Sequence, residues 1–258
     1  MWTTGLRKVG GMANTTAPKT TVNATDANTK LPRAAFWDMD GTLINSEPIW
    51  HEAELWFAEQ YGGDWSEEMG WKVTGTPVPQ VAQMMIDRGI KLGVEELTAG
   101  IIDFVAKREM EQMPWMPGVL DVLVATRDAG IPNVLVTASP RVMAESAVAQ
   151  APEGVFAAYV CHDDVTEKKP HPAPFLAAAA KLGIKGDQIR ECIALEDSAV
   201  GLESAARSGA TTIALTGYIH SDNPPSKNGP QFACIETWDG VTPQLFHDLV
   251  ELRLKSGR

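Results

Sequence analysis

The sequence predicts an α/β protein built on a doubly wound parallel sheet, with an all-helical segment inserted after the first strand. Two observations carry this prediction. Short apolar runs alternate with helical patterns through most of the chain, and one long stretch shows helical patterns alone. Strands that alternate with helices need crossover connections, which place parallel strands side by side and cover both faces of the sheet with helices.

Four apolar runs are typical of strands buried on both faces, because each is short and lacks the alternation of a half-exposed strand. The expected strands are 34–37, 131–136, 192–195 and 211–215. The helices expected beside them are 119–129, 142–150, 174–182 and 199–208. Three of these helices are followed by Gly130, Gly183 and Gly209, and glycine commonly ends a helix.

The stretch from 47 to 115 predicts a helical cap domain, because it holds helical patterns and no convincing strand. Its expected helices are 49–60, 78–88 and 95–113. Five of the eight tryptophans lie in it or at its edge: Trp50, Trp56, Trp65, Trp71 and Trp115. We expect them to form a small domain core. The alternative is that one or two line a pocket for the face of a sugar.

The rest of the chain divides into a tail and a core. Residues 1–32 are rich in Thr, Ala, Asn and Lys without helical or strand periodicity, which predicts a flexible N-terminal tail. The α/β core domain is then expected to comprise 33–46 and 116–258.

The composition of the chain limits which binding partners and which cellular compartment are expected. The formal net charge of −11 argues against a nucleic acid and against an anionic membrane surface. The three cysteines are widely spaced, which favours a reducing cytoplasm over a disulfide framework or a zinc site. No apolar run is long enough to span a membrane, and the first 30 residues lack the apolar region of a signal peptide. We expect a cytoplasmic monomer or weak homodimer that acts on a small molecule.

Polar residues stand just past the expected strands. Asp38 and Asp40 follow the first strand, Thr137 follows the second and Glu196-Asp197 follow the third, while Lys168-Lys169 lie in the loop before it. Ligands of open parallel sheets bind outside the carboxyl ends of the strands, so these groups are expected to converge there.

The converging groups suit phosphoryl transfer. One carboxylate can attack phosphorus and a second can protonate the leaving oxygen. Several acids together would repel a phosphate, so a Mg²⁺ ion and a lysine are needed to offset their charge. Each motif alone has a plainer explanation: a surface turn for D-x-D, a rigid loop for K-P-x-P, and a helix N-cap by Asp197 or Ser198 for E-D-S. The four motifs in order favour a common site.

This set resembles the haloacid dehalogenase superfamily, in the branch whose helical cap follows the first strand, over roughly residues 33–254. Asp38-Met39-Asp40-Gly41-Thr42 matches the D-x-D-G-T signature in full. The resemblance implies a Rossmann-like core. It also implies that Asp38 is the nucleophile and a metal ligand, and that Asp40 is the acid/base whose backbone carbonyl binds the metal.

The same resemblance implies the remaining site residues. Thr137, with Ala138 beside it, corresponds to the phosphate-binding position, and Ser139 is a further candidate for phosphate contact. Lys169 corresponds to the lysine that steadies the phosphoryl group, because that lysine directly precedes a proline. Glu196 and Asp197 correspond to the acidic pair that completes the Mg²⁺ site.

Within the superfamily, the chain resembles the beta-phosphoglucomutase-like proteins and the neighbouring sugar-phosphate phosphatases. The mutase has a Lys-Gly step and a nearby Arg in a cap loop, and a His twelve positions after the nucleophile. Here Thr74 stands at the Lys position and Trp50 at the His position, which favours a phosphatase. Gly75 and Thr76 are candidates for contact with the leaving group, and nearby Lys72 keeps the mutase open.

The sequence therefore predicts Mg²⁺-dependent hydrolysis of a small phosphate monoester through an aspartyl-phosphate. A sugar or sugar-alcohol phosphate is the expected substrate class. The alternatives are a phosphomutase and a catalytically idle binding protein. True dehalogenation is a minor alternative, because it needs neither a metal nor Asp40.

Overall fold

The computed structural model describes residues 7–8, 32–217 and 228–257. The tail expected at 1–32 lies outside the described residues, apart from Pro32 and the two-residue strand β1 (Arg7–Lys8). No helix in the described ranges is long and apolar enough to cross a membrane.

A seven-stranded sheet forms the centre of the molecule, in the order β1-β7-β6-β5-β2-β3-β4. Its strands after β1 run parallel to one another, and β1 pairs antiparallel with β7. They are β2 (Ala35–Trp37), β3 (Asn133–Val136), β4 (Phe156–Val160), β5 (Ile193–Glu196), β6 (Thr211–Leu215) and β7 (Ala233–Ile235). The predicted parallel α/β core is confirmed.

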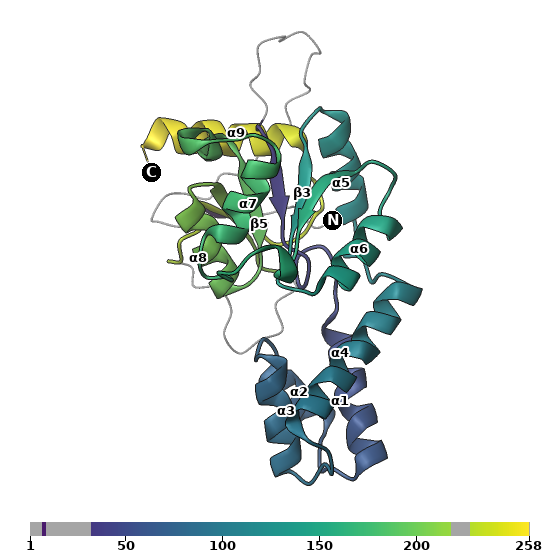
Figure 1. The fold of residues 1–258 in the computed structure, drawn as a ribbon. Coiled ribbons are helices and arrows are strands. Elements are labelled where there is room, and N and C mark those ends of the chain that lie inside the picture. Colours follow the sequence, from purple (N-terminus) through teal and green to yellow (C-terminus); the bar gives the residue numbers. More distant parts are fainter. Residues whose placement is uncertain (1–6, 9–31, 218–227, 258) are drawn as a thin grey trace.

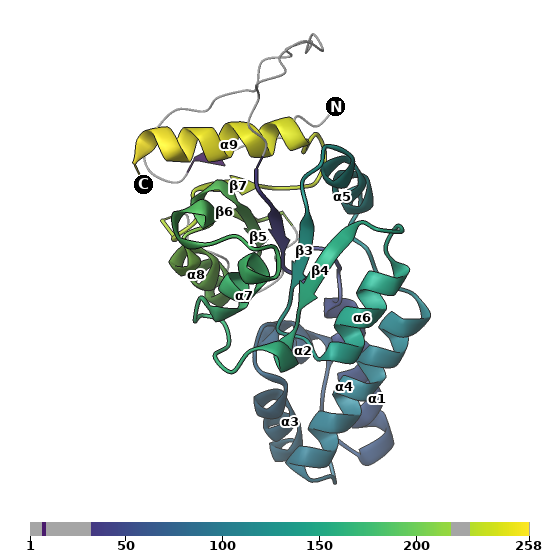
Figure 2. The same ribbon diagram turned by 45° about the horizontal axis from the view of Figure 1, so that its top comes forward.

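Helices cover both faces of this sheet (Figures 1 and 2). They are α5 (Val119–Asp128), α6 (Arg141–Gln150), α7 (Ala173–Lys181), α8 (Ala199–Ser208) and α9 (Pro243–Ser256), with short 3-10 turns η1 (His162–Asp164) and η2 (Gly186–Glu191). Successive residues of β2 enter opposite layers, because strand side chains alternate between faces. Trp37 packs in the cluster with α5, α6 and α9, and Phe36 in the cluster with α7 and α8.

The cap consists of α1 (Glu47–Tyr61), α2 (Glu67–Val73), α3 (Val78–Asp87) and α4 (Val94–Glu111). It lies beyond the carboxyl ends of the parallel strands (Figures 1 and 2). Two chain segments join it to the core side by side, since Ile44 bridges to Trp115 and the Asn45 amide donates to the Pro114 carbonyl at 2.9 Å. The predicted helical insert after the first strand is confirmed.

The tryptophan prediction for the cap is only partly correct, because Trp50, Trp65 and Trp115 pack against the core without filling it. None of the five is fully buried, and Trp56 is 41% exposed. The cap interior is filled instead by aliphatic and methionine side chains on α3 and α4: Val81, Met85, Leu97, Ile101 and Val105. Indole rings are large and carry an N–H group, so they stay at the margin of a core this small.

A hydrogen-bonded pair fastens the centre of the sheet to its neighbours. The indole N–H of Trp37 donates to Asn133 Oδ1 at 2.9 Å, and Asn133 is 1% exposed. The Asn133 amide donates in turn to the carbonyls of Leu123 and Val155, both at 3.0 Å. One side chain thereby satisfies three buried backbone or ring groups from separate elements.

Replacing Asn133 tests this role. Asn133→Leu should lower the free energy of unfolding by about 3 kcal/mol, because a buried donor and two buried carbonyls lose their partner. Urea denaturation measures the effect, with Gln80→Leu on the exposed surface of α3 as the matched control. A loss in Asn133→Leu no larger than in the control would contradict the assignment.

Candidate active site

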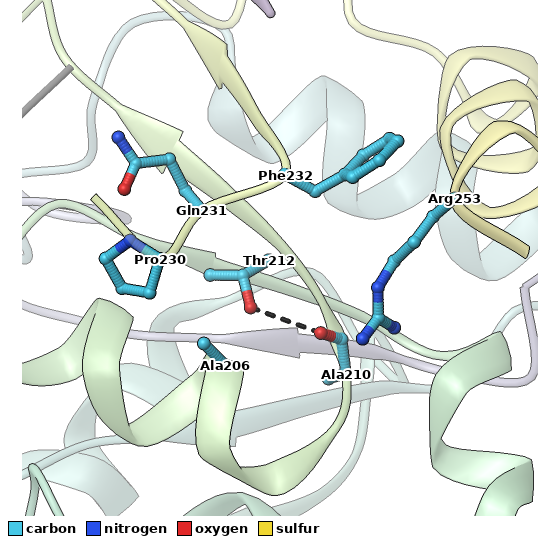
Figure 3. Close-up of a pocket in the computed structure, with 7 residues that line it drawn as sticks. All are labelled: Ala206, Ala210, Thr212, Pro230, Gln231, Phe232 and Arg253. Carbon is cyan, nitrogen blue, oxygen red and sulfur yellow. Dashed lines mark hydrogen bonds between the residues drawn. The ribbon is translucent and has the colours of Figure 1, made fainter. Parts of the chain in front are cut away.

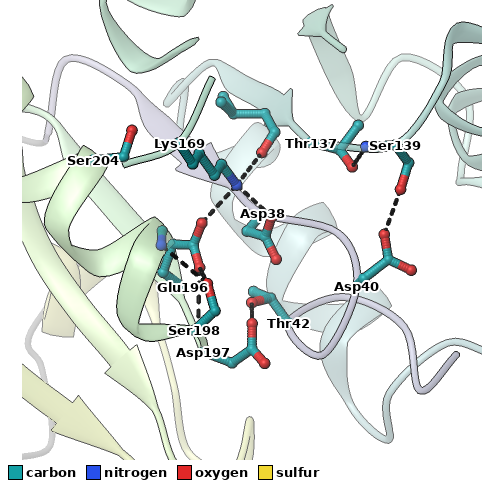
Figure 4. Close-up of polar contacts among 12 residues, drawn as sticks. Asp38, Asp40, Thr42, Thr137, Ser139, Lys169, Glu196, Asp197, Ser198 and Ser204 are labelled. Carbon is teal, nitrogen blue, oxygen red and sulfur yellow. Dashed lines mark hydrogen bonds and ion pairs between the residues drawn. The ribbon is translucent and has the colours of Figure 1, made fainter. Parts of the chain in front are cut away.

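Three central strands deliver polar residues to one edge of the sheet. Trp37 lies opposite Leu135 on β3 and opposite Leu195 on β5. Asp38 and Glu196, each one residue further along, therefore emerge side by side, with Thr137 two residues beyond Leu135. Figure 4 shows these side chains turned toward a common centre.

Lys169 connects the acids of this centre. Its Nζ lies 2.6 Å from Asp38 Oδ1 and 2.6 Å from Glu196 Oε1, and it donates to the Val136 carbonyl at 3.0 Å. The side chain is 7% exposed. Burial alone would lower the pKa of Lys169, but the carboxylates of Asp38 and Glu196 outweigh it and raise the pKa. The ammonium is thus held in its charged form.

The structure separates this lysine from its neighbour. Lys168 donates to the carbonyls of His162 and Val165, so its ammonium is engaged in fastening the loop around η1. Lys169 alone of the pair contacts the acids, and its role in steadying a phosphoryl group stays a prediction.

The acids outnumber the cation. One oxygen each from Asp38, Glu196 and Asp197 form a group whose members lie within 4.8 Å of one another. Burial, and then the charge of Asp38, raise the pKa of Glu196 to about 7. The same causes raise the pKa of Asp197 well above its ordinary value. These oxygen donors fit a small hard cation such as Mg²⁺, which would offset the charge that Lys169 leaves uncompensated.

Two glycines let the backbone approach these carboxylates. A Cβ atom on Gly41 would lie 2.1 Å from Asp197 Oδ2, and one on Gly201 would lie 1.9 Å from Glu196 Oε1. Gly41 also has a φ of +80°, which favours glycine. Gly41, the glycine of the D-x-D-G-T motif, therefore makes room for the side chain of Asp197, which directly follows β5.

Asp40 is clamped by two hydroxyl groups. Ser46 donates to its Oδ1 at 2.7 Å and Ser139 donates to its Oδ2 at 2.6 Å. Burial is the largest influence on Asp40; together with the charge of Asp38 it outweighs these hydrogen bonds and raises the pKa of Asp40. A carboxyl group that holds its proton suits a general acid.

The turn after β3 places the predicted phosphate-binding residues. Thr137 is 3% exposed, and its Oγ1 accepts from the Ser139 amide at 2.9 Å. Ala138 is exposed in the turn between them. Ser139, a candidate for phosphate contact, instead directs its hydroxyl to Asp40.

The segment from residue 32 to 209 matches the family model described as haloacid dehalogenase-like hydrolase. The chain belongs to this family. It is 31% identical over 210 residues to Hexitol phosphatase B of Escherichia coli strain K12, covering 77% of this chain and 87% of that protein. It is 27% identical over 192 residues to the Phosphorylated carbohydrates phosphatase of Thermotoga maritima, covering 74% and 87%.

Solved structures of similar fold support the architecture. A putative beta-phosphoglucomutase from Thermotoga maritima superposes with a TM-score of 0.66 at 24% identity, covering 87% of this chain and 99% of that one. A haloacid dehalogenase family IA hydrolase from Entamoeba histolytica gives 0.68 at 21% identity, covering 85% and 99%. At these identities the likeness concerns the fold.

The cap contributes the turn between α2 and α3, which holds Gly75 and Thr76. Gly75 is exposed with a φ of +79°, and a Cβ on it would meet nothing within 4 Å. The hydroxyl of Thr74, the preceding residue, donates to Glu47 Oε2 at 3.3 Å. This contact ties the turn to the start of α1, and the role of Gly75 and Thr76 in leaving-group contact stays a prediction.

A cavity of about 220 Å³ lies elsewhere, beside the start of β6 (Figure 3). Thr212, Phe232 and Arg253 line it. The Arg253 guanidinium is already engaged, since it donates to the Gly209 carbonyl at 2.7 Å and to Thr211 Oγ1 at 3.3 Å. Because Thr212 is near the amino end of its strand, this cavity is separate from the acidic centre.

Three polar residues near the site are not predicted by the sequence. Ser46 stands at the N-cap position of α1, yet its hydroxyl binds Asp40 rather than capping the helix. Glu47 follows it. Glu109 lies in the last turn of α4, four residues after Val105 on the apolar stripe, and this position is the signal of its burial. The S-E-P step at 46–48 is the signal that would have directed attention to the first two.

Glu109 is an unusual buried acid. It is 0% exposed, and neither carboxyl oxygen has a hydrogen-bond partner within the described part of the chain. Burial, and then the charge of Asp40, raise the pKa of Glu109 from its ordinary 4.5 to about 8. The folded protein therefore binds this proton more tightly than the unfolded chain does. Its contribution to stability is complete below pH 4.5 and is lost as the pH rises toward 8.

Glu109→Gln should weaken this pH dependence. The free energy of unfolding of the wild type should fall more than that of the variant between about pH 5 and pH 8, by about 2 to 3 kcal/mol. Urea denaturation across this range measures the difference. Glu111→Gln, with a side chain 72% exposed, is the control and should follow the wild type. Parallel pH profiles for wild type and Glu109→Gln would refute the account of this acid.

Proposed function

We propose that the protein hydrolyses a small phosphate monoester through an aspartyl-phosphate formed on Asp38, with a sugar or sugar-alcohol phosphate as substrate. The observation that carries this proposal is the ammonium of Lys169, buried between Asp38 and Glu196 at 2.6 Å from each. The names of the relatives, Hexitol phosphatase B and Phosphorylated carbohydrates phosphatase, support the substrate class.

In the first half of the reaction, an Asp38 carboxylate oxygen forms a bond to phosphorus as the ester P–O bond breaks. Asp40 gives its proton to the departing oxygen, which leaves as an alcohol. Burial raises the pKa of Asp40 and so keeps that proton in place beforehand, while the hydroxyl groups of Ser46 and Ser139 fix the position of the carboxyl group. Lys169 offsets the negative charge of the phosphoryl oxygens, and Thr137 with the Ala138 amide binds them.

In the second half, water attacks phosphorus and the Asp38–phosphorus bond breaks. Asp40, now ionised, takes the proton of the water, and inorganic phosphate is released. Asp38, the Asp40 carbonyl, Glu196 and Asp197 would hold the Mg²⁺. When bound, Mg²⁺ supplies positive charge that neutralises the phosphoryl oxygens and the acids around them.

The cap supports hydrolysis over mutase chemistry. A mutase acting on a hexose phosphate must bind a second phosphate, which calls for cations on the cap that face the site. Lys72, the nearest cap lysine to the α2–α3 turn, pairs at 2.7 Å with Glu68 on the exposed surface of α2. Arg108 pairs with Glu52 at 2.5 Å, and both are about half exposed. Neither is turned toward Asp38 as a phosphate ligand.

The proposal also covers how the chain is divided into domains and in which cellular compartment the protein works. Residues 33–46 and 116–258 would form the catalytic core, and 47–115 the cap that excludes bulk water when it closes. Cys161, Cys192 and Cys234 are all thiols, which supports a reducing compartment such as the cytoplasm.

A panel of phosphate esters tests the function. The wild type should release inorganic phosphate from hexitol and hexose monophosphates with Mg²⁺, and should lose nearly all activity when Mg²⁺ is omitted. Asp38→Asn should reduce the rate by at least about 10³-fold, because an amide cannot attack phosphorus. Asp239→Asn, at an exposed loop position, is the matched control. Full activity in Asp38→Asn would exclude Asp38 as the nucleophile, and isomerised sugar phosphate without phosphate release would indicate the mutase.

A further inference from the structure

Glu47 lies close enough to the acidic centre for the charge of Asp40 to act on it, and it has no role in phosphoryl transfer. It is the first residue of α1 and directly follows Ser46, whose hydroxyl binds Asp40 at 2.7 Å. Its side chain is 30% exposed, so an incoming molecule can reach it. It therefore lies where the cap begins, next to the residue whose hydroxyl holds Asp40.

One oxygen of Glu47 is fixed and the other is available. Oε2 accepts from Thr74 Oγ1 at 3.3 Å and lies 3.7 Å from His51 Nε2. His51 is itself held against Trp71, with ring centroids 4.2 Å apart. Among the residues that the structure describes, Oε1 of Glu47 has no hydrogen-bond partner. The carboxyl group is thus oriented by the cap while one acceptor stays open.

The charge around Glu47 selects what can bind there. Burial raises the pKa of Glu47 to about 7, with a further contribution from the charge of Asp40. Above that pKa the Glu47 side chain is a carboxylate, and a second phosphate group placed beside it would be repelled. A hydroxyl group can donate to the open oxygen, and hydrogen bonds to ionised acceptors are the stronger ones.

We propose that Glu47 binds a hydroxyl group of the leaving alcohol through Oε1, so that the enzyme favours mono-phosphorylated polyols and disfavours esters that carry a second phosphate. The inference rests on the proposed phosphatase function and names the chemistry by which the cap recognises its substrate. It makes Glu47 a specificity residue, while Asp38 and Asp40 carry out the reaction.

The test compares two esters on two variants. Glucitol 6-phosphate offers hydroxyl groups to Glu47, whereas phenyl phosphate offers none. Glu47→Gln should lower the ratio of kcat/KM for glucitol 6-phosphate to that for phenyl phosphate by roughly tenfold, because a charged hydrogen bond becomes a neutral one. Glu59→Gln, exposed further along α1, is the matched control and should keep the wild-type ratio.

Reversing the charge at position 47 should increase activity on an ester that carries two phosphate groups. Glu47→Lys should raise kcat/KM for fructose 1,6-bisphosphate relative to glucitol 6-phosphate, because the ammonium attracts the second phosphate. Thermal denaturation checks that each variant is folded. If Glu47→Gln is not folded, Glu47→Asp takes its place. It should also lower the ratio of kcat/KM for glucitol 6-phosphate to that for phenyl phosphate.

The outcomes separate the two proposals. An unchanged ester ratio in a folded Glu47 variant, with no gain on the bisphosphate in Glu47→Lys, overturns the role of Glu47 and leaves the phosphatase proposal intact. A wild type that releases phosphate from neither ester overturns both.

Discussion

The buried ammonium of Lys169 is the interaction on which the site depends. Four carboxyl groups gather at one edge of the sheet, and like charges in a buried place oppose one another. Lys169 contacts two of them at 2.6 Å and stays charged because of them. Without this cation, the carboxyl groups of Asp38 and Glu196 would face each other with no positive charge between them. The remaining excess of negative charge is what makes the centre suited to a divalent cation and then to a phosphate.

The fold brings these groups together through strand register rather than through long side chains. Because Trp37 is aligned with Leu135 and Leu195, the residues that follow the three strands share one edge. Gly41 and Gly201 then allow the backbone to come within contact of the carboxylates. Burial of β2 on both faces holds this alignment, with Asn133 linking Trp37 to two further elements.

The sequence predicts this core well because its signals are local. Apolar runs that end in polar residues mark β2, β3, β5 and β6, and helix α8 has the expected bounds. Ser198 is the N-cap of α8, since its Oγ accepts from the Gly201 amide at 3.0 Å. Strand β4 was not predicted: it is only partly buried and contains two alanines, so its pattern is weak. Helix α2 has seven residues with a glycine inside, too short for a clear period.

Contacts between distant segments could not be predicted from the sequence. The pairs Ser139–Asp40 and Thr74–Glu47 join residues far apart in the chain, and each depends on how the cap and core loops meet. The spacing of Glu109 from Val105 points to the buried face of α4, but its nearness to Asp40 depends on how the cap and core meet. These residues are also where this chain can differ in specificity and pH response from relatives that share the D-x-D-G-T motif.

The most direct test of the account is to identify the atom that receives the phosphoryl group. The enzyme would be mixed with a reactive phosphate ester and Mg²⁺, quenched in acid within one turnover, digested and examined by mass spectrometry. The account predicts a phosphoryl group on the peptide that contains Asp38, attached to Asp38 itself and absent in Asp38→Asn. A phosphoryl group on another residue, or turnover with no phosphorylated peptide under conditions that preserve acyl phosphates, would contradict it.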